Sequence, residues 1–114
     1  NKSMIRIAFD LDNTLASQGS PKENYRDSVL REEMIELVNK LYDKGHEIYI
    51  FTARHFKHFK YTDETLKKSG LKYTGLVMNK INCDLFVDDR GFRWEEGRSK
   101  DLITLIQELQ KNEK

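Results

Sequence analysis

The chain has 114 residues, of which 38% are hydrophobic and 34% charged, which suffices for one hydrophobic core and argues against intrinsic disorder. Twenty basic against nineteen acidic residues leave a formal net charge of +1, which disfavours nucleic-acid binding through bulk charge but leaves a local basic patch open. The single cysteine, Cys83, excludes an intrachain disulfide and a cysteine-based zinc cage, and no run approaches the ~20 apolar residues of a membrane span. We therefore expect one cytoplasmic domain over residues 1–114 that does not contact membranes, with residues 1–3 left over from expression.

The apolar pattern alternates short strands with amphipathic helices. Residues 5–9 (IRIAF) form an apolar run that predicts a buried strand, and residues 29–43 repeat apolar side chains at helical spacing. Between them, residues 16–28 contain the only proline and several small polar residues, which predicts a flap loop. The other expected elements are a strand at 47–51, a helix near 62–68 capped by Thr62 or Asp63, strands at 75–78 and 84–87, and a helix at 99–111. This alternation predicts an α/β fold in which helices cover both faces of a parallel sheet of about four strands.

Side chains that can take part in catalysis or ligand binding follow every expected strand. They are Asp10 and Asp12 after the first strand, Thr52, Ala53 and Arg54 after the second, Lys80 after the third, and Asp88 and Asp89 after the fourth. The functional groups of parallel sheets gather at the carboxyl ends of the strands. We therefore expect these residues to converge on one edge of the sheet and to form one site.

The carboxylates at these strand ends indicate a divalent cation. Asp10 and Asp12 flank a single apolar residue, and burying a carboxylate without a partner is unfavourable. A cation would offset that cost, and oxygen-only ligands favour Mg²⁺. Asp88 and Asp89 would complete the site from the neighbouring strand. The alternative is that these acids cap helices or turns. This explanation would have to be correct separately at each carboxylate-rich strand end.

The same residues suit phosphoryl transfer. A carboxylate beside magnesium can attack phosphorus and form an aspartyl-phosphate. Lys80 would neutralise the remaining phosphoryl oxygens, and the Thr52 hydroxyl would donate a hydrogen bond to one of them. Asp12 would protonate the leaving alcohol and then deprotonate the water that attacks the phosphoenzyme.

At these residues the sequence resembles the haloacid dehalogenase superfamily of phosphotransferases. The matching segments occur in family order: DLDNTL at 10–15, FTAR at 51–54, NK at 79–80 and DLFVDDR at 84–90. The second aspartate of the first segment is typical of the phosphatases, whereas Asn13 stands where many members have glycine. The resemblance implies a three-layer Rossmann-like fold with strand order 3-2-1-4.

The resemblance also implies a role for each residue. Asp10 would be the nucleophile and a metal ligand, and Asp12 would be the general acid and base and would bind the metal through its backbone carbonyl. Asp88 would bind Mg²⁺, while Asp89 would act on the metal directly, through water, or by anchoring Lys80. The residues expected to bind the substrate phosphoryl group are Thr52, Ala53, Arg54 and Lys80.

The segments between the motifs leave room for a minimal cap or none. Only a short loop follows the first motif, and residues 53–79 accommodate one helix and a short strand. Water exclusion would then depend on the substrate or on a neighbouring subunit, so a homo-oligomer is one expected assembly. The spacing most resembles small bacterial phosphatases of capsule and surface polysaccharide biosynthesis, which implies a phosphorylated small molecule, such as a sugar phosphate, as the substrate.

Two other functions stay open at this stage. The DDR ending also occurs in the 3′-phosphatase module of polynucleotide kinases, so a nucleic-acid end is an alternative substrate. A receiver-like phospho-signalling module is the non-enzymatic alternative, but its phosphoacceptor follows the third strand, where this chain has Met78, Asn79 and Lys80. Residues 54–60 (RHFKHFK) interleave aromatic and basic side chains, which suits a nucleic-acid strand or an anionic sugar but equally describes a solvated loop. We expect His46 at the surface and Cys83 buried as a small hydrophobe.

Overall fold

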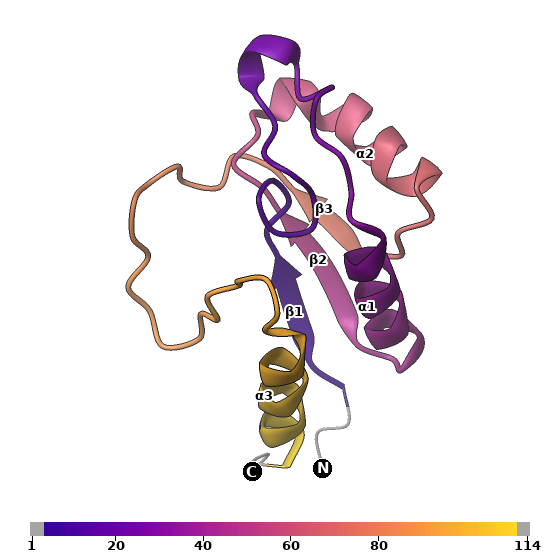
Figure 1. Cartoon of the computed structure of the whole chain (residues 1–114), viewed down its shortest axis with the longest axis vertical. Coiled ribbons are helices and arrows are strands. Elements are labelled where there is room, and N and C mark those ends of the chain that lie inside the picture. Colours follow the sequence, from indigo (N-terminus) through magenta and orange to yellow (C-terminus); the bar gives the residue numbers. More distant parts are fainter. Residues whose placement is uncertain (1–3, 112–114) are drawn as a thin grey trace. The chain divides into compact units, whose positions relative to one another are not determined.

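The computed structural model describes residues 4–111 (Figure 1). This part of the chain divides into two compact units, one over Arg6–Ile81 and one that includes Asn82 onward together with Ile5. Each unit is described by itself. The expectations of a single domain over residues 1–114 and of an expression remnant stay predictions, and residues 1–3 lie outside the described residues.

The first unit contains a parallel sheet. Strands β1 (Arg6–Phe9), β2 (Glu47–Phe51) and β3 (Gly75–Val77) lie in the order β1-β2-β3. In the register, Ile7 faces Ile48 and Tyr49 faces Gly75. Figure 1 shows the three strands side by side with their carboxyl ends at the same edge. The α/β class with a parallel sheet is therefore confirmed, and this unit contains three of the expected strands in the expected order.

Helix α1 (Glu32–Asp43) connects β1 to β2 and buries one stripe of side chains. Met34, Val38 and Leu41 recur at helical spacing and are at most 2% exposed. Gly45, with φ of +97°, ends the helix in the left-handed conformation that glycine adopts without strain. The next residue, His46, is buried, contrary to its expected surface position, because it joins the helix end to β2 and its N–H donates to the carbonyl of Leu41.

Helix α2 (Phe59–Lys68) connects β2 to β3 and follows a short 3₁₀ turn, η2 (Phe56–His58). It begins before the expected 62–68, so Thr62 lies inside the helix and is fully buried rather than acting as its cap. Asn39 of α1 fastens the turn after α2, because its amide group donates to the carbonyl of Gly70 and accepts from the N–H of Lys72. The flap loop contains one further 3₁₀ turn, η1 (Pro21–Glu23).

The second unit contains helix α3 (Ser99–Lys111), in which Leu102 and Ile106 are buried as the apolar spacing predicts, whereas Leu109, which the same spacing predicts to face inward, is exposed. The expected fourth strand at 84–87 is not formed: among the described residues, no strand follows β3. Leu85 and Val87 are 72% and 88% exposed, and the next residues form a local turn in which the Asp88 carboxylate accepts the N–H groups of Arg90 and Gly91. Cys83, in the same segment, is exposed rather than buried. Within the described chain, every helix is too short or too polar to traverse a bilayer.

Candidate active site

The loop after β1 presents two aspartates because its apolar residues are buried beneath it. Leu11 and Leu15 are at most 2% exposed, and the N–H groups of Thr14 and Ala16 both donate to the carbonyl of Leu11. The chain turns at Asn13, whose φ of +67° is a left-handed conformation that asparagine tolerates better than most residues. The loop therefore fixes Asp10 and Asp12 on either side of a buried leucine.

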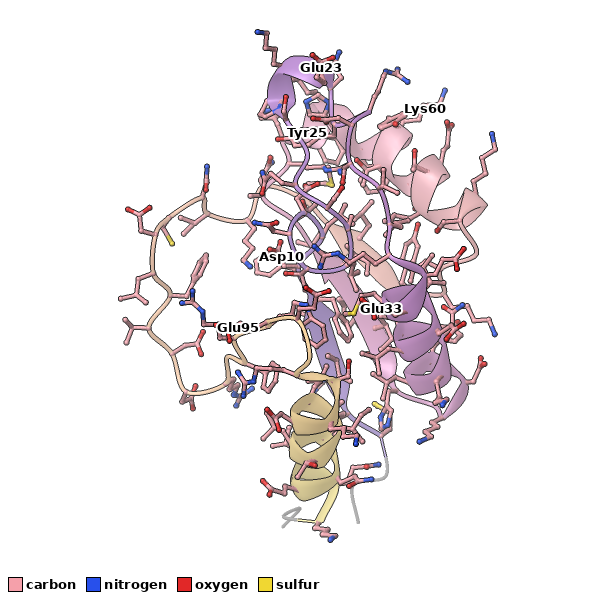
Figure 2. All side chains as sticks on the ribbon, viewed as in Figure 1. Asp10, Glu23, Tyr25, Glu33, Lys60 and Glu95 are labelled. Atoms are coloured by element: carbon pink, nitrogen blue, oxygen red, sulfur yellow. The ribbon has the colours of Figure 1, made fainter. Side chains whose placement is uncertain are left out.

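Asp10 is the carboxylate at the end of β1, where Figure 2 labels it. Burial raises the pKa of Asp10, and the charge of Lys80, the N–H of Leu11 and the hydroxyl of Thr14 oppose that rise. The negative charge of Asp12 adds to the rise. The half-buried Asp10 carboxylate is therefore within electrostatic reach of both Lys80 and Asp12.

Main-chain hydrogen bonds join the ends of β2 and β3. The N–H of Thr52 donates to the carbonyl of Val77, and the carbonyl of Thr52 accepts from the N–H of Lys80, both at 2.9 Å. The N–H of Asn79 donates to the carbonyl of Arg54, also at 2.9 Å. Thr52 and Lys80 are therefore placed side by side by the backbone.

The Lys80 side chain lies beside an aromatic ring at this edge. Its Nζ lies 5.4 Å from the ring centroid of Phe51. The positive charge of the same ammonium acts on the Asp10 carboxylate and opposes the rise of its pKa.

Asp12 forms a two-pronged ion pair with Arg54. The Nε of Arg54 donates to Oδ2 of Asp12 and its Nη2 donates to Oδ1, both at 2.8 Å. The side chain of Arg54 is 5% exposed and that of Asp12 is 15% exposed. The Nη1 of Arg54 donates to the hydroxyl of Thr62 on α2, at 3.1 Å. This geometry is the strong, directional form of a charged hydrogen bond.

The flap loop, residues 16–28, lies against this pair. The Ser28 hydroxyl is 2.9 Å from Oδ1 of Asp12, and the ring of Tyr25 stacks 4.3 Å from the guanidinium carbon of Arg54. Tyr25 also makes an edge contact with His58, 5.1 Å between ring centroids. Gly19 allows this approach, because a Cβ there would lie 2.8 Å from Oδ1 of Asp12 and 2.9 Å from the Cβ of Ser28.

A small cavity separates the flap from α2. Its accessible volume is about 30 Å³, enough for a small number of waters. Its lining residues are Leu11, Ala16, Tyr25, Ser28, Leu30, Arg54, Tyr61, Thr62, Thr65 and Leu66. The cavity therefore lies on the side of the guanidinium that faces the flap and α2.

The structure brings together most of the residues that the sequence predicted for the site. Asp10, Asp12, Thr52 and Lys80 share the carboxyl edge of the sheet, with Arg54 bound to Asp12. Ala53 lies between Thr52 and Arg54 and is exposed.

Asp88 and Asp89 belong to the second unit, so their predicted role at the metal stays a prediction. Both aspartates are exposed, and the N–H groups of Arg90 and Gly91 lower the pKa of Asp88. Within residues 4–111, no three histidine, cysteine or acidic side chains gather as a metal-binding group.

Sequence reasoning missed three residues of this site. Ser28 and Thr62 contact Asp12 and Arg54 from the flap and from α2, and only their polarity in a loop and on a buried helical face hinted at a role. Asn79 has φ of +63°, and its Oδ1 accepts the N–H of Phe56 at the start of η2. An asparagine after a strand is a recognisable turn signal, but the sequence did not show which segment its side chain would bind.

The parallel sheet, with carboxylates, a hydroxyl and a lysine at its carboxyl edge, places the chain in the class of α/β proteins whose functional groups gather at that edge. The sequence profile of the haloacid dehalogenase-like hydrolases matches residues 7–112, and the chain belongs to this family. No curated protein matches the chain. In the described segments between β1 and β3, the chain forms only the flap loop, the two 3₁₀ turns, α1 and α2 besides β2, which is consistent with the small, capless type.

Two solved structures are similar to the chain. One is the crystal structure of a target protein from Vibrio cholerae, with a TM-score of 0.65 and 22% identity, over 90% of this chain and 99% of that one. The other belongs to the Pnkp1/Rnl/Hen1 RNA repair complex, with a TM-score of 0.54 and 20% identity, over 95% of this chain but only 32% of that one. Both similarities show the fold.

Proposed function

We propose that the protein is a magnesium-dependent phosphomonoester hydrolase that forms an aspartyl-phosphate on Asp10. The observation that supports this proposal is the arrangement of Asp10 at the end of β1, within the fields of Lys80 and Asp12 and at the sheet edge where Thr52 lies. In this arrangement Asp10 would attack phosphorus, Lys80 would neutralise the phosphoryl charge and Asp12 would transfer the proton.

In the first step, an Asp10 oxygen forms a bond to phosphorus while the bond from phosphorus to the alcohol oxygen breaks. Asp12, which is a carboxylate in its ion pair with Arg54, must first take up a proton from solvent, and it then gives that proton to the departing alcohol oxygen. Lys80 neutralises the phosphoryl oxygens. The Thr52 hydroxyl already accepts the N–H of Arg54, so its own proton is available for a phosphoryl oxygen.

In the second step, water attacks the aspartyl-phosphate. Asp12 takes a proton from that water, the bond between phosphorus and the Asp10 oxygen breaks, and inorganic phosphate leaves. Asp12 thereby regains the proton that it gave to the alcohol in the first step.

The site residues fit a magnesium ion by the chemistry of their donors. The half-buried Asp10 carboxylate and the Asp12 carbonyl are oxygen donors of the kind that suits Mg²⁺, and the proposal includes Asp88 and Asp89 as further carboxylate ligands. When bound, the ion would screen the repulsion between the Asp10 carboxylate and an anionic substrate. A cytoplasmic location and a homo-oligomer complete the proposal, and light scattering measures the oligomeric state.

The experiment compares the parent protein with Asp10→Asn. The parent should hydrolyse 4-nitrophenyl phosphate in the presence of Mg²⁺, and a screen of sugar phosphates should identify a better substrate. Asp10→Asn retains the size of the side chain but removes the nucleophilic carboxylate, so it should lose at least ~100-fold in rate. Equal activity of the two proteins would reject the mechanism.

A second candidate substrate is a polynucleotide 3′-phosphate. The observation that favours it is an aromatic and basic surface at η2 and the flap. Phe56 is 61% exposed beside Lys57, and Arg26 stacks 4.6 Å from the ring of Tyr61. Exposed rings beside cations are the means by which proteins bind single strands of nucleic acid. The similarity to a chain of an RNA repair complex supports the same candidate.

The test compares a 3′-phosphorylated oligonucleotide with a sugar phosphate. Loss of one base-stacking ring costs about 1–3 kcal/mol, so Phe56→Ala should lower kcat/KM for the oligonucleotide by about 5-fold to 160-fold while sparing the sugar phosphate. Tyr42→Ala, on α1, is the control, because Tyr42 is also an exposed aromatic at 39% exposure. Equal losses on both substrates would exclude a nucleic-acid role for Phe56.

A further inference from the structure

We propose that Arg54 is a positioning residue for Asp12, with the flap residue Tyr25 covering the pair, and that it does not bind the substrate phosphate. This inference rests on the proposed function, in which Asp12 transfers the proton. The motif position of Arg54, two residues after Thr52, makes it a candidate phosphate ligand. The structure instead directs its side chain to Asp12.

Three of the five N–H groups of Arg54 are engaged within the protein. Both Asp12 oxygens accept from it at 2.8 Å, and the Thr62 hydroxyl accepts from Nη1 at 3.1 Å. The side chain is only 5% exposed. The remaining N–H groups belong to a side chain that is almost fully buried, and a substrate phosphate could use the Nε and Nη2 pair only by displacing the Asp12 carboxylate, which would leave a largely buried acid without its charged partner.

The pair is also covered from the flap. The Tyr25 ring stacks 4.3 Å from the guanidinium carbon, while the Ser28 hydroxyl approaches Oδ1 of Asp12 at 2.9 Å. Tyr25 has φ of +63°, a left-handed conformation that is uncommon for a bulky residue and indicates that the surrounding contacts determine its position. Figure 2 shows Tyr25 on the flap and Asp10 at the end of β1.

The consequence for catalysis follows from this geometry. A two-pronged ion pair fixes the plane of the Asp12 carboxylate as well as its distance. Proton transfer needs that orientation, whereas phosphate binding does not. Loss of the guanidinium fork should therefore affect substrates in proportion to their need for a proton on the leaving oxygen.

The experiment compares Arg54→Lys with the parent on two substrates. 4-Nitrophenyl phosphate has a good leaving group, whereas an alkyl phosphate needs protonation. Lysine retains the charge but loses the fork, so kcat/KM for the alkyl phosphate should fall at least ~10-fold, with less than ~3-fold loss for 4-nitrophenyl phosphate. Inhibition by inorganic phosphate should keep its constant within about 2-fold, because a positioning residue does not bind that anion.

The opposite pattern overturns the inference. If Arg54 bound the phosphate, Arg54→Lys would raise the inhibition constant of inorganic phosphate at least ~10-fold and would weaken both substrates equally. Failure of the proposed function looks different, because activity would then survive Asp10→Asn.

Two further variants keep the test decisive. Tyr25→Leu preserves the ion pair and removes the ring that covers it. This variant should also lower kcat/KM more for the alkyl phosphate than for 4-nitrophenyl phosphate, but by a smaller factor than Arg54→Lys does. In an Asp12→Asn background, Arg54→Lys should leave the ratio between the two substrates unchanged, since the group that Arg54 positions is gone. Where Arg54→Lys folds, an additive effect in the Asp12→Asn background would refute the positioning role. If Arg54→Lys fails to fold, an unchanged ratio in Tyr25→Leu would refute it.

Discussion

Thr62→Val is the substitution that most directly measures how the protein stabilises the buried guanidinium. Valine has the shape of threonine but lacks its hydroxyl, and Thr62 is fully buried inside α2, where it accepts a hydrogen bond from Arg54. A hydrogen bond to a charged group contributes about 1.5–3 kcal/mol, and a buried donor left without an acceptor costs a similar amount. We therefore expect the free energy of unfolding to fall by about 2 kcal/mol.

Urea unfolding measures this loss. With a slope of about 1–3 kcal/mol per molar urea, a loss of about 2 kcal/mol lowers the midpoint by roughly 1 M. Thr65→Val is the matched control, because Thr65 lies one turn further along α2 and lines the same cavity, while the Nη1 hydrogen bond of Arg54 goes to Thr62. If the two valine variants unfold within about 0.5 kcal/mol of each other, the Thr62 hydroxyl does not stabilise Arg54 and the reasoning is wrong.

Three other predictions concern stability and metal dependence. Leu15 is fully buried, so Leu15→Ala should lower the free energy of unfolding by about 2–5 kcal/mol. Leu109 is 51% exposed, so the control Leu109→Ala should change it by less than ~0.5 kcal/mol. Equal effects of the two variants in thermal unfolding would contradict the burial of the loop. The Tyr73 hydroxyl lowers the pKa of Asp63, and burial together with Asp63 raises the pKa of Tyr73. Stability from Asp63 is therefore present above its ordinary pKa of 3.8 and lost as the pH falls through the lowered value, while stability from Tyr73 is present below 10.0 and lost as the pH rises beyond it. Tyr73→Phe should flatten both limbs of the stability curve, and unchanged limbs in urea titrations across pH would count against this pair. Finally, EDTA should abolish hydrolysis of 4-nitrophenyl phosphate and added Mg²⁺ should restore it, whereas full activity in EDTA would contradict the metal requirement.

The strand ends were the part of the fold that the sequence predicted best. In β1 and β2, the short apolar run that stops at an acid or a hydroxyl marked both the strand and its carboxyl end, as Ile50 and Thr52 illustrate. The helical spacing of Met34, Val38 and Leu41 was equally informative, because one buried stripe determines which face of α1 is covered. These signals are local, so the sequence carries them fully.

The remaining features depend on partners that are distant in the sequence. Residues 84–87 have the apolar character of a strand, but a strand also needs a neighbouring ladder, and an apolar run does not specify one. The partner of Arg54 is likewise hidden: a side chain after a strand can turn toward a ligand or toward Asp12, and only the positions of Tyr25 and Thr62 decide between them. His46 was wrongly placed at the surface because its burial comes from the helix end beside it.

Main-chain hydrogen bonds hold Lys80 and Asn79 beside Thr52 and Arg54. The positions of these residues therefore do not depend on the side chains of the intervening segment, residues 55–74. Both ends of that segment are anchored by peptide groups, which every amino-acid sequence possesses. Evolution can therefore lengthen it, shorten it or change its charge without displacing the threonine or the lysine, provided that one hydroxyl still reaches the arginine from α2. Such a chain can acquire new substrates by exchanging a surface segment while its chemistry stays constant.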